Sequence, residues 1–193
     1  MSDLNRCWLG FPFPADLHEK IKAAQMQIRK RAGGDTIRWL PQGEVALLLV
    51  TIGEVGSNTL LRVGAVVEQV VARHSAINLA LEGAGGSPNM TMPKSAWVGV
   101  SGDVAALKKL RQDLSVCVRP LVTAIDDKEF QAVVEVGLLR KFDERDRTEM
   151  GRALKLSNLG VLGEFRLDAV HVLASHATTA GPALHSLKSF PLR

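Results

Sequence analysis

The chain has 193 residues, of which 46% are hydrophobic and 23% are charged, and its formal net charge at pH 7 is +4. This length is enough to bury one substantial core, and the composition excludes a disordered or collagen-like chain. The basic balance favours anionic partners, although most of the basic residues are interleaved with acids, as in a solvated surface.

The cysteines and the hydropathy pattern indicate a cytoplasmic protein. Cys7 and Cys117 lie far apart and lack the C-x-x-C spacing of a zinc site or redox pair. No apolar run approaches the roughly 18 residues that cross a bilayer, and the N-terminus lacks the pattern of a secretory signal. We therefore expect a soluble protein in a reducing compartment, without a membrane partner.

The first third of the chain predicts a strand, a helix and a central strand. Residues 6–11 are typical of a short strand, and the prolines after them end it. Gly33-Gly34 is expected to end the helix that follows, and residues 44–52 are apolar on both faces, as in a strand covered on both sides. The helix is predicted from apolar residues at helical spacing, namely Leu17, Ile21, Ala24 and Ile28.

The middle of the chain predicts a helix followed by a hairpin. The helix is expected over about residues 58–73, with Ser57 or Asn58 as its N-cap. Residues 77–81 alternate like a half-buried strand, residues 83–93 read as a flexible loop, and residues 95–100 read as the second strand. Although residues 83–88 are glycine-rich, no helix N-terminus follows them, so a hairpin loop is favoured over a phosphate-binding loop.

The last part predicts a helix over about 103–116 and a second central strand over about 129–138. A charged helix near 146–156 and strands at the C-terminal end complete an α+β chain. The order of elements partly repeats, and no separable linker is visible. We expect residues 1–193 to form one bilobal domain with intertwined lobes. The C-terminal strands are expected at 165–167, at 170–174 and in a last strand that ends at 190–192.

Three stretches, in this order, carry a resemblance to a known family. The first is Trp8–Pro14, followed by Arg38-Trp39-Leu40 and Gly53-Glu54-Val55. The second is Pro93–Val100, and the third is Phe165–Val170 with the glycine, proline and phenylalanine pattern after it. Together they resemble the two-histidine phosphoesterase superfamily, in particular its LigT-like family of 2′-5′ RNA ligases and RNA 2′,3′-cyclic phosphodiesterases.

The resemblance implies a bilobal α+β fold in which two pseudo-twofold-related lobes place antiparallel sheets across a central cleft, with helices outside. In this family each lobe supplies one His-x-Thr motif. The two imidazoles act as general base and general acid, and the threonine hydroxyls bind phosphate oxygens. Because residues i and i+2 of a strand share a face, both side chains of a motif reach the cleft.

The chain departs from the family at this site. The first motif falls on Ala46 and Leu48, and the second falls on Val133 and Glu135, so no catalytic residue is retained there. Neither expected central strand contains a histidine in any register. Thr51 is expected on the opposite face from Ala46 and Leu48, by the period of two.

These losses predict a catalytically degenerate protein that binds RNA, a nucleotide or a protein partner without hydrolysis. Each general acid or base contributes on the order of 100- to 10,000-fold, so losing both removes the family's activity for practical purposes. One alternative is an active phosphodiesterase with relocated catalytic groups, and another is a structural or interaction subunit. The relocated groups would come from His74, His171, His176 and His185.

Three further residues are candidates for ligand binding, namely Arg38, Glu135 and Arg140. If Glu135 faces the cleft, its carboxylate would repel a phosphate. No cofactor is expected, and no metal-ligand cluster is visible in the sequence. His74 is expected to interact with the last-turn carbonyls of its helix, and His176 and His185 are expected to be exposed surface residues.

Overall fold

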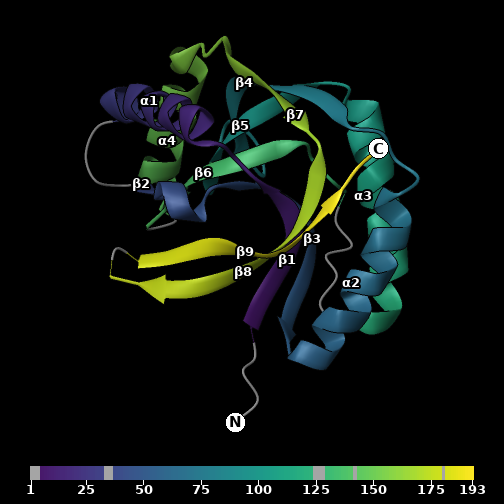
Figure 1. Cartoon of the computed structure of the whole chain (residues 1–193). Coiled ribbons are helices and arrows are strands. Elements are labelled where there is room, and N and C mark those ends of the chain that lie inside the picture. Colours follow the sequence, from purple (N-terminus) through teal and green to yellow (C-terminus); the bar gives the residue numbers. More distant parts are fainter. Residues whose placement is uncertain (1–4, 33–36, 124–128, 141–142, 180) are drawn as a thin grey trace.

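The computed structural model describes residues 5–32, 37–123, 129–140, 143–179 and 181–193, which form two antiparallel sheets with helices outside (Figure 1). The strands are β1 (Asn5–Pro12), β2 (Ile37–Trp39), β3 (Ala46–Val55), β4 (Ile77–Ser87), β5 (Ser95–Gly102), β6 (Val133–Leu139), β7 (Val161–Leu167), β8 (Ala169–Thr178) and β9 (Gly181–Pro191). The helices are α1 (Ala15–Ala32), α2 (Ser57–Val71), α3 (Val104–Val118) and α4 (Glu144–Ser157), with 3-10 turns at Gln42–Glu44 and Arg119–Leu121. None of these helices is long and apolar enough to cross a membrane.

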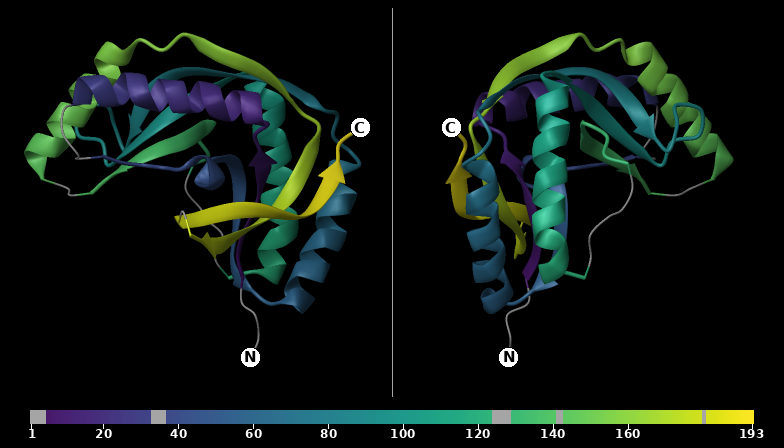
Figure 2. Two further views of the ribbon diagram at one scale, coloured as in Figure 1. Left: turned by 60° about the vertical axis from the view of Figure 1, so that its left-hand side comes forward. Right: turned by 90° about the vertical axis from the view of Figure 1, so that its right-hand side faces the viewer.

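The helices exchange between the two sheets. One sheet has the order β3-β1-β8-β9 and carries α2 and α3 on its outer face, whereas the other has the order β2-β6-β5-β4-β7 and carries α1 and α4 (Figure 2). Helix α1 follows β1 of the first sheet but packs on the second, and α3 follows β5 of the second sheet but packs on the first. This arrangement confirms the α+β fold with two facing antiparallel sheets.

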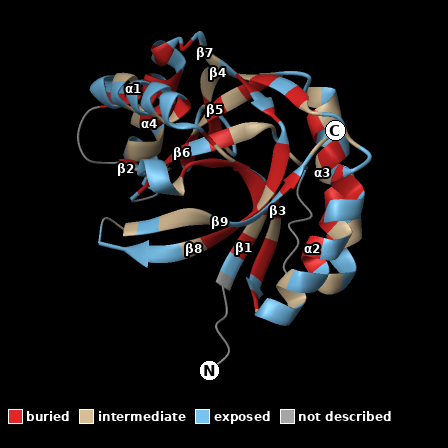
Figure 3. Cartoon of the chain, in the orientation of Figure 1, coloured by how far each residue is buried: buried red, intermediate tan, exposed pale blue. Residues whose placement is uncertain are grey.

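The core lies between each sheet and its helices. Figure 3 shows buried residues along the strands and on the helix faces that cover them. The predicted apolar stripe of α1 is buried, with Leu17, Ile21, Ala24 and Ile28 at most 2% exposed. Because this stripe follows the helical period, its burial is what fixes the roll of α1 on the second sheet.

Several predicted boundaries were wrong. The expected loop at residues 83–93 is shorter, because β4 continues to Ser87 and pairs there with β5. Its glycines serve packing, since a Cβ at Gly85 would lie 2.1 Å from the ring of Trp97. The N-cap of α2 is Gly56, without a side-chain cap, and β6 begins only at Val133. The predicted helix end at Gly33-Gly34 lies outside the described residues.

Gly10 of β1 provides a test of the packing between β1 and β3. A Cβ at this position would lie 2.6 Å from the backbone oxygen of Leu47, closer than real contacts allow. Gly10→Ala should therefore lower the free energy of unfolding in urea by about 1–3 kcal/mol. Gly160→Ala is the control, since a Cβ there meets nothing within 4 Å. Equal midpoints for both variants would contradict this packing.

The two cysteines should differ in reactivity. Cys7 on β1 is 0% exposed, and burial raises the pKa of its thiol to about 11. Cys117 on α3 is only half-buried. In the native protein an alkylating reagent should modify Cys117 first, and Cys7 should react only after denaturation, as mass spectrometry of peptides would resolve. Equal native labelling of both thiols would contradict the burial of β1.

Candidate functional site

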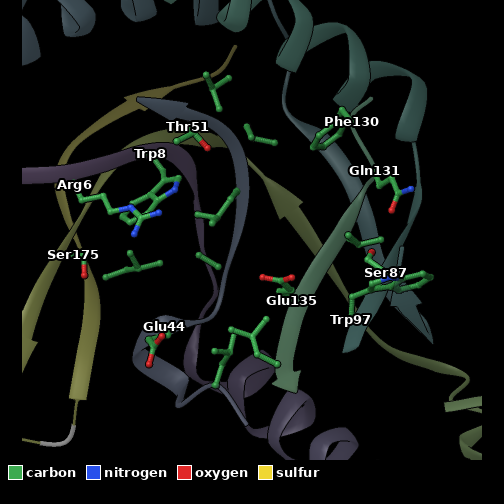
Figure 4. Close-up of a pocket in the computed structure, with 18 of the residues that line it drawn as sticks. Arg6, Trp8, Glu44, Thr51, Ser87, Trp97, Phe130, Gln131, Glu135 and Ser175 are labelled. Atoms are coloured by element: carbon green, nitrogen blue, oxygen red, sulfur yellow. The ribbon is translucent and has the colours of Figure 1, made fainter. Parts of the chain in front are cut away.

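A cleft of about 560 Å³ lies between the facing sides of the two sheets. One wall comes from β1, β3 and the β8–β9 hairpin, and the other from β5, β6 and the segment before β6, as Figure 4 shows. The outer faces of both sheets are covered by helices, so the cleft is the side of each sheet that remains open to a ligand.

The four positions on which the sequence resemblance places the family's motifs all line this cleft. Ala46 and Leu48 come from β3 on one wall, and Val133 and Glu135 come from β6 on the other. In each strand, the residue after the pair has no partner in the register with the neighbouring strand, namely Leu49 of β3 opposite β1 and Val136 of β6 opposite β5. The two strands thus share this irregularity, and Ala46, Leu48, Val133 and Glu135 carry neither an imidazole nor a hydroxyl.

The position of Thr51 was predicted wrongly. Strand β1 pairs Gly10 with Leu48 but Leu9 with Val50, so Leu49 forms a β-bulge. A bulge shifts the alternation of side chains by one residue, and Thr51 consequently lines the cleft with Ala46 and Leu48. The period of two does not hold across this bulge, and a bulge leaves no mark in an apolar run of sequence.

The predicted ligand-binding residues are only partly brought together. Arg38 lines the cleft, where its guanidinium donates to both carboxylate oxygens of Glu44 at 3.2 and 3.5 Å. Glu135 lines the cleft and has no hydrogen bond or ion pair with any residue that the structure describes. Arg140 follows the end of β6, is exposed, and is not among the residues that line the cleft.

Three aromatic rings lie in the cleft that were not predicted as site residues. Trp8, Trp97 and Phe130 all line it. The guanidinium carbon of Arg6 lies 5.3 Å from the centre of the Trp8 ring, and that of Arg111 lies 5.6 Å from the Phe130 ring. For Trp8 the sequence holds a signal in the alternation of β1. Its neighbours Cys7 and Leu9 are buried in the core, so the Trp8 side chain lies on the opposite face of the strand.

None of the histidines, all of which lie in the described part of the chain, lines the cleft. His74 was expected to contact helix carbonyls, but its Nε2 lies 3.0 Å from Oδ2 of Asp113 on α3. Hydrogen bonds from Lys109 and then from His74 hold the pKa of Asp113 below its ordinary value. His171 Nδ1 lies 2.9 Å from the Ser186 hydroxyl oxygen. His74 and His171 therefore each have a local partner outside the cleft.

His176 and His185 form a pair on the β8–β9 hairpin, with their Nδ1 atoms 2.9 Å apart. His176 is exposed as expected, but His185 is half-buried. His176-Ala177-Thr178 has the His-x-Thr spacing, yet it lies on β8, where the Thr178 hydroxyl donates to the carbonyl of Gly181. This spacing therefore serves the hairpin and does not supply the cleft. Among the described residues there is also no group of three potential metal ligands.

Two imidazoles predict a pH effect on stability. Burial lowers the pKa of His171, and burial also lowers the pKa of His18 against weaker opposing contacts. At pH values below about 6.5, the ordinary pKa of histidine, the unfolded chain binds more protons than the folded chain does. The free energy of unfolding should therefore fall as the pH falls toward the pKa of these groups in the folded protein.

His171→Gln removes one of these titrating groups and keeps an amide near Ser186. The drop in unfolding free energy between about pH 7.5 and about pH 5.5 should be smaller in this variant than in the wild type. Urea unfolding at both pH values measures the difference, and any packing effect cancels because it acts at both. The same drop in both proteins would contradict the burial of this imidazole.

Comparisons with known proteins agree with this geometry. No family profile matches the chain. It is 18% identical over 188 residues to the RNA 2′,3′-cyclic phosphodiesterase of Aquifex aeolicus, covering 97% of each chain, and 23% identical over 185 residues to that of Archaeoglobus fulgidus, covering 96% and 99%. Solved structures with similar folds are TT0787 of Thermus thermophilus (TM-score 0.76, 18% identity, 97% and 98% covered) and E. coli LigT complexed with 3′-AMP (TM-score 0.75, 18% identity, 98% and 99% covered). The chain therefore has the two-histidine phosphoesterase fold and is related over almost its whole length to the LigT-like family of RNA 2′,3′-cyclic phosphodiesterases.

Proposed function

We propose that this protein is a catalytically degenerate LigT-like protein that binds a ligand in its central cleft and does not hydrolyse phosphodiesters. One observation carries the proposal. Ala46, Leu48, Val133 and Glu135 line the cleft at the motif positions, and none of them can act there as the imidazole or hydroxyl of a His-x-Thr pair. The cleft itself, about 560 Å³, has the size of a small-molecule site.

The chemistry of the family depends on two positioned proton-transfer groups. Each contributes on the order of 100- to 10,000-fold to the rate, and here both are replaced by groups without an imidazole. The four histidines considered as relocated groups, His74, His171, His176 and His185, do not line the cleft and have partners elsewhere. No observation favours an active enzyme with a displaced site.

The ligand is expected to use the rings of the cleft. E. coli LigT has been solved with 3′-AMP, ATP and NADP+. A nucleotide or RNA end remains a candidate ligand by this relationship, and the rings of Trp8, Trp97 and Phe130 support binding of a planar group. A phosphate at the second motif would be repelled by the carboxylate of Glu135. We therefore infer that the planar ring of the ligand contributes more to its affinity than a phosphate does.

Hydrolysis of a 2′,3′-cyclic nucleotide tests the proposal. The purified wild type should show no turnover above background. The quadruple variant Ala46→His/Leu48→Thr/Val133→His/Glu135→Thr restores both motifs on facing walls and should gain measurable activity, since each restored group contributes on the order of 100-fold or more. Chromatography of the ring-opened product measures both.

A half-restored variant is the matched control. Ala46→His/Leu48→Thr supplies one imidazole and should stay well below the quadruple variant, because acid and base act on opposite sides of the reacting phosphate. The proposal would be contradicted if the wild type hydrolysed the 2′,3′-cyclic nucleotide at a rate that stays constant through repeated purification.

A further inference from the structure

Glu135 places a carboxylate in the middle of the cleft. Val134 and Val136, on either side of it, are both 0% exposed and point to the core behind β6. The alternation of the strand therefore turns Glu135 toward the cleft. Figure 4 shows its carboxylate directed away from β6 and toward β3 on the facing wall.

In the part of the chain that the structure describes, no arginine of the cleft forms an ion pair with this carboxylate. Arg38 is bound to Glu44 through both oxygens. The guanidinium groups of Arg6 and Arg111 lie over aromatic rings of the cleft. Glu135, by contrast, has no hydrogen bond or ion pair with any described residue, so its charge is available to a ligand.

On the wall that faces Glu135, the two positions of the first motif offer hydrocarbon side chains, and Thr51, further along β3, adds a hydroxyl. Ala46, Leu48 and Val50 of β3 all line the cleft there. Glu135 is exposed in the free protein, so a ligand that covers it displaces water from the carboxylate and strengthens its attraction for an opposite charge. The same carboxylate repels a phosphate, so the part of the cleft between Glu135 and β3 favours a ligand with a positive group and an apolar body.

We propose that the cleft binds a compact organic cation, whose ammonium, amidinium or guanidinium group pairs with Glu135 while its apolar body packs against β3. This inference rests on the proposed non-hydrolytic binding function and names the ligand class for the same cleft. It makes the carboxylate at the second motif position a recognition group for positive charge.

Three probes of the same size and different charge test the inference. Benzamidine is cationic, benzamide is neutral and benzoate is anionic, and all three carry one planar ring. In isothermal titration calorimetry of the full chain, benzamidine should bind at least about tenfold more tightly than benzamide, as expected for one charge-assisted hydrogen bond. Benzoate should bind most weakly.

Glu135→Gln keeps the size of the side chain and removes its charge. Its affinity for benzamidine should fall about tenfold or more, whereas its affinity for benzamide should stay the same. Glu164→Gln is the matched control, since Glu164 is an exposed glutamate of β7 that does not line the cleft. Glu129→Gln tests the other cleft glutamate without a described ion pair, and it should retain most of the benzamidine affinity.

Equal binding of benzamidine and benzamide, or an unchanged benzamidine affinity in Glu135→Gln, would overturn the inference. So would a loss of affinity confined to Glu129→Gln. A different result would be that 3′-AMP binds more tightly than benzamidine and that the 2′,3′-cyclic nucleotide is not hydrolysed. This result would overturn the preference for a cation and would leave the proposed binding function in place. Turnover of the cyclic substrate by the wild type would instead remove the binding function on which the inference rests.

Discussion

The alternation of side chains along β3 and β6 is the constraint on which both the core and the cleft depend. In β6, Val134 and Val136 enter the core while Glu135 faces the cleft. In β3, Leu47 is buried while Leu48 is 37% exposed toward the cleft. Each strand therefore has one face in the core and one face in the cleft. Burial of the helix-covered face fixes the register of the strand, and this register determines which residues line the cleft.

This constraint separates the requirements for folding from those for catalysis. The cleft positions do not fill the core between sheet and helices, so a histidine or threonine there can be replaced without disturbing the packing behind the strand. In the proposed function, the apolar side chains of Ala46 and Leu48 stand where the family has polar groups, and the cleft would favour a different ligand for that reason. The scaffold stays the same while the chemistry of its open side changes.

The sequence predicted the elements with strong periodicity and missed features set by tertiary contacts. The stripe of α1 and the two central strands were predicted because their apolar residues repeat at the period of a helix or a strand. The extension of β4 to Ser87 was missed because its glycines resemble a loop, although Gly85 is required by the ring of Trp97. The place of Thr51 in the cleft depends on the bulge at Leu49, which follows from pairing with β1.

The exchange of α1 and α3 between the sheets also determines what a break in the chain would do to the fold. The segment from Pro88 to Lys94, between β4 and β5, divides the chain into an N-terminal part and a C-terminal part. Each sheet takes strands from both parts, since β1 pairs with β8 in one sheet and β4 pairs with β5 and β7 in the other. A proteolytic cut in this segment would leave two fragments that each lack strands of both sheets. The fragments would hold their structure only by remaining associated, as a complemented pair.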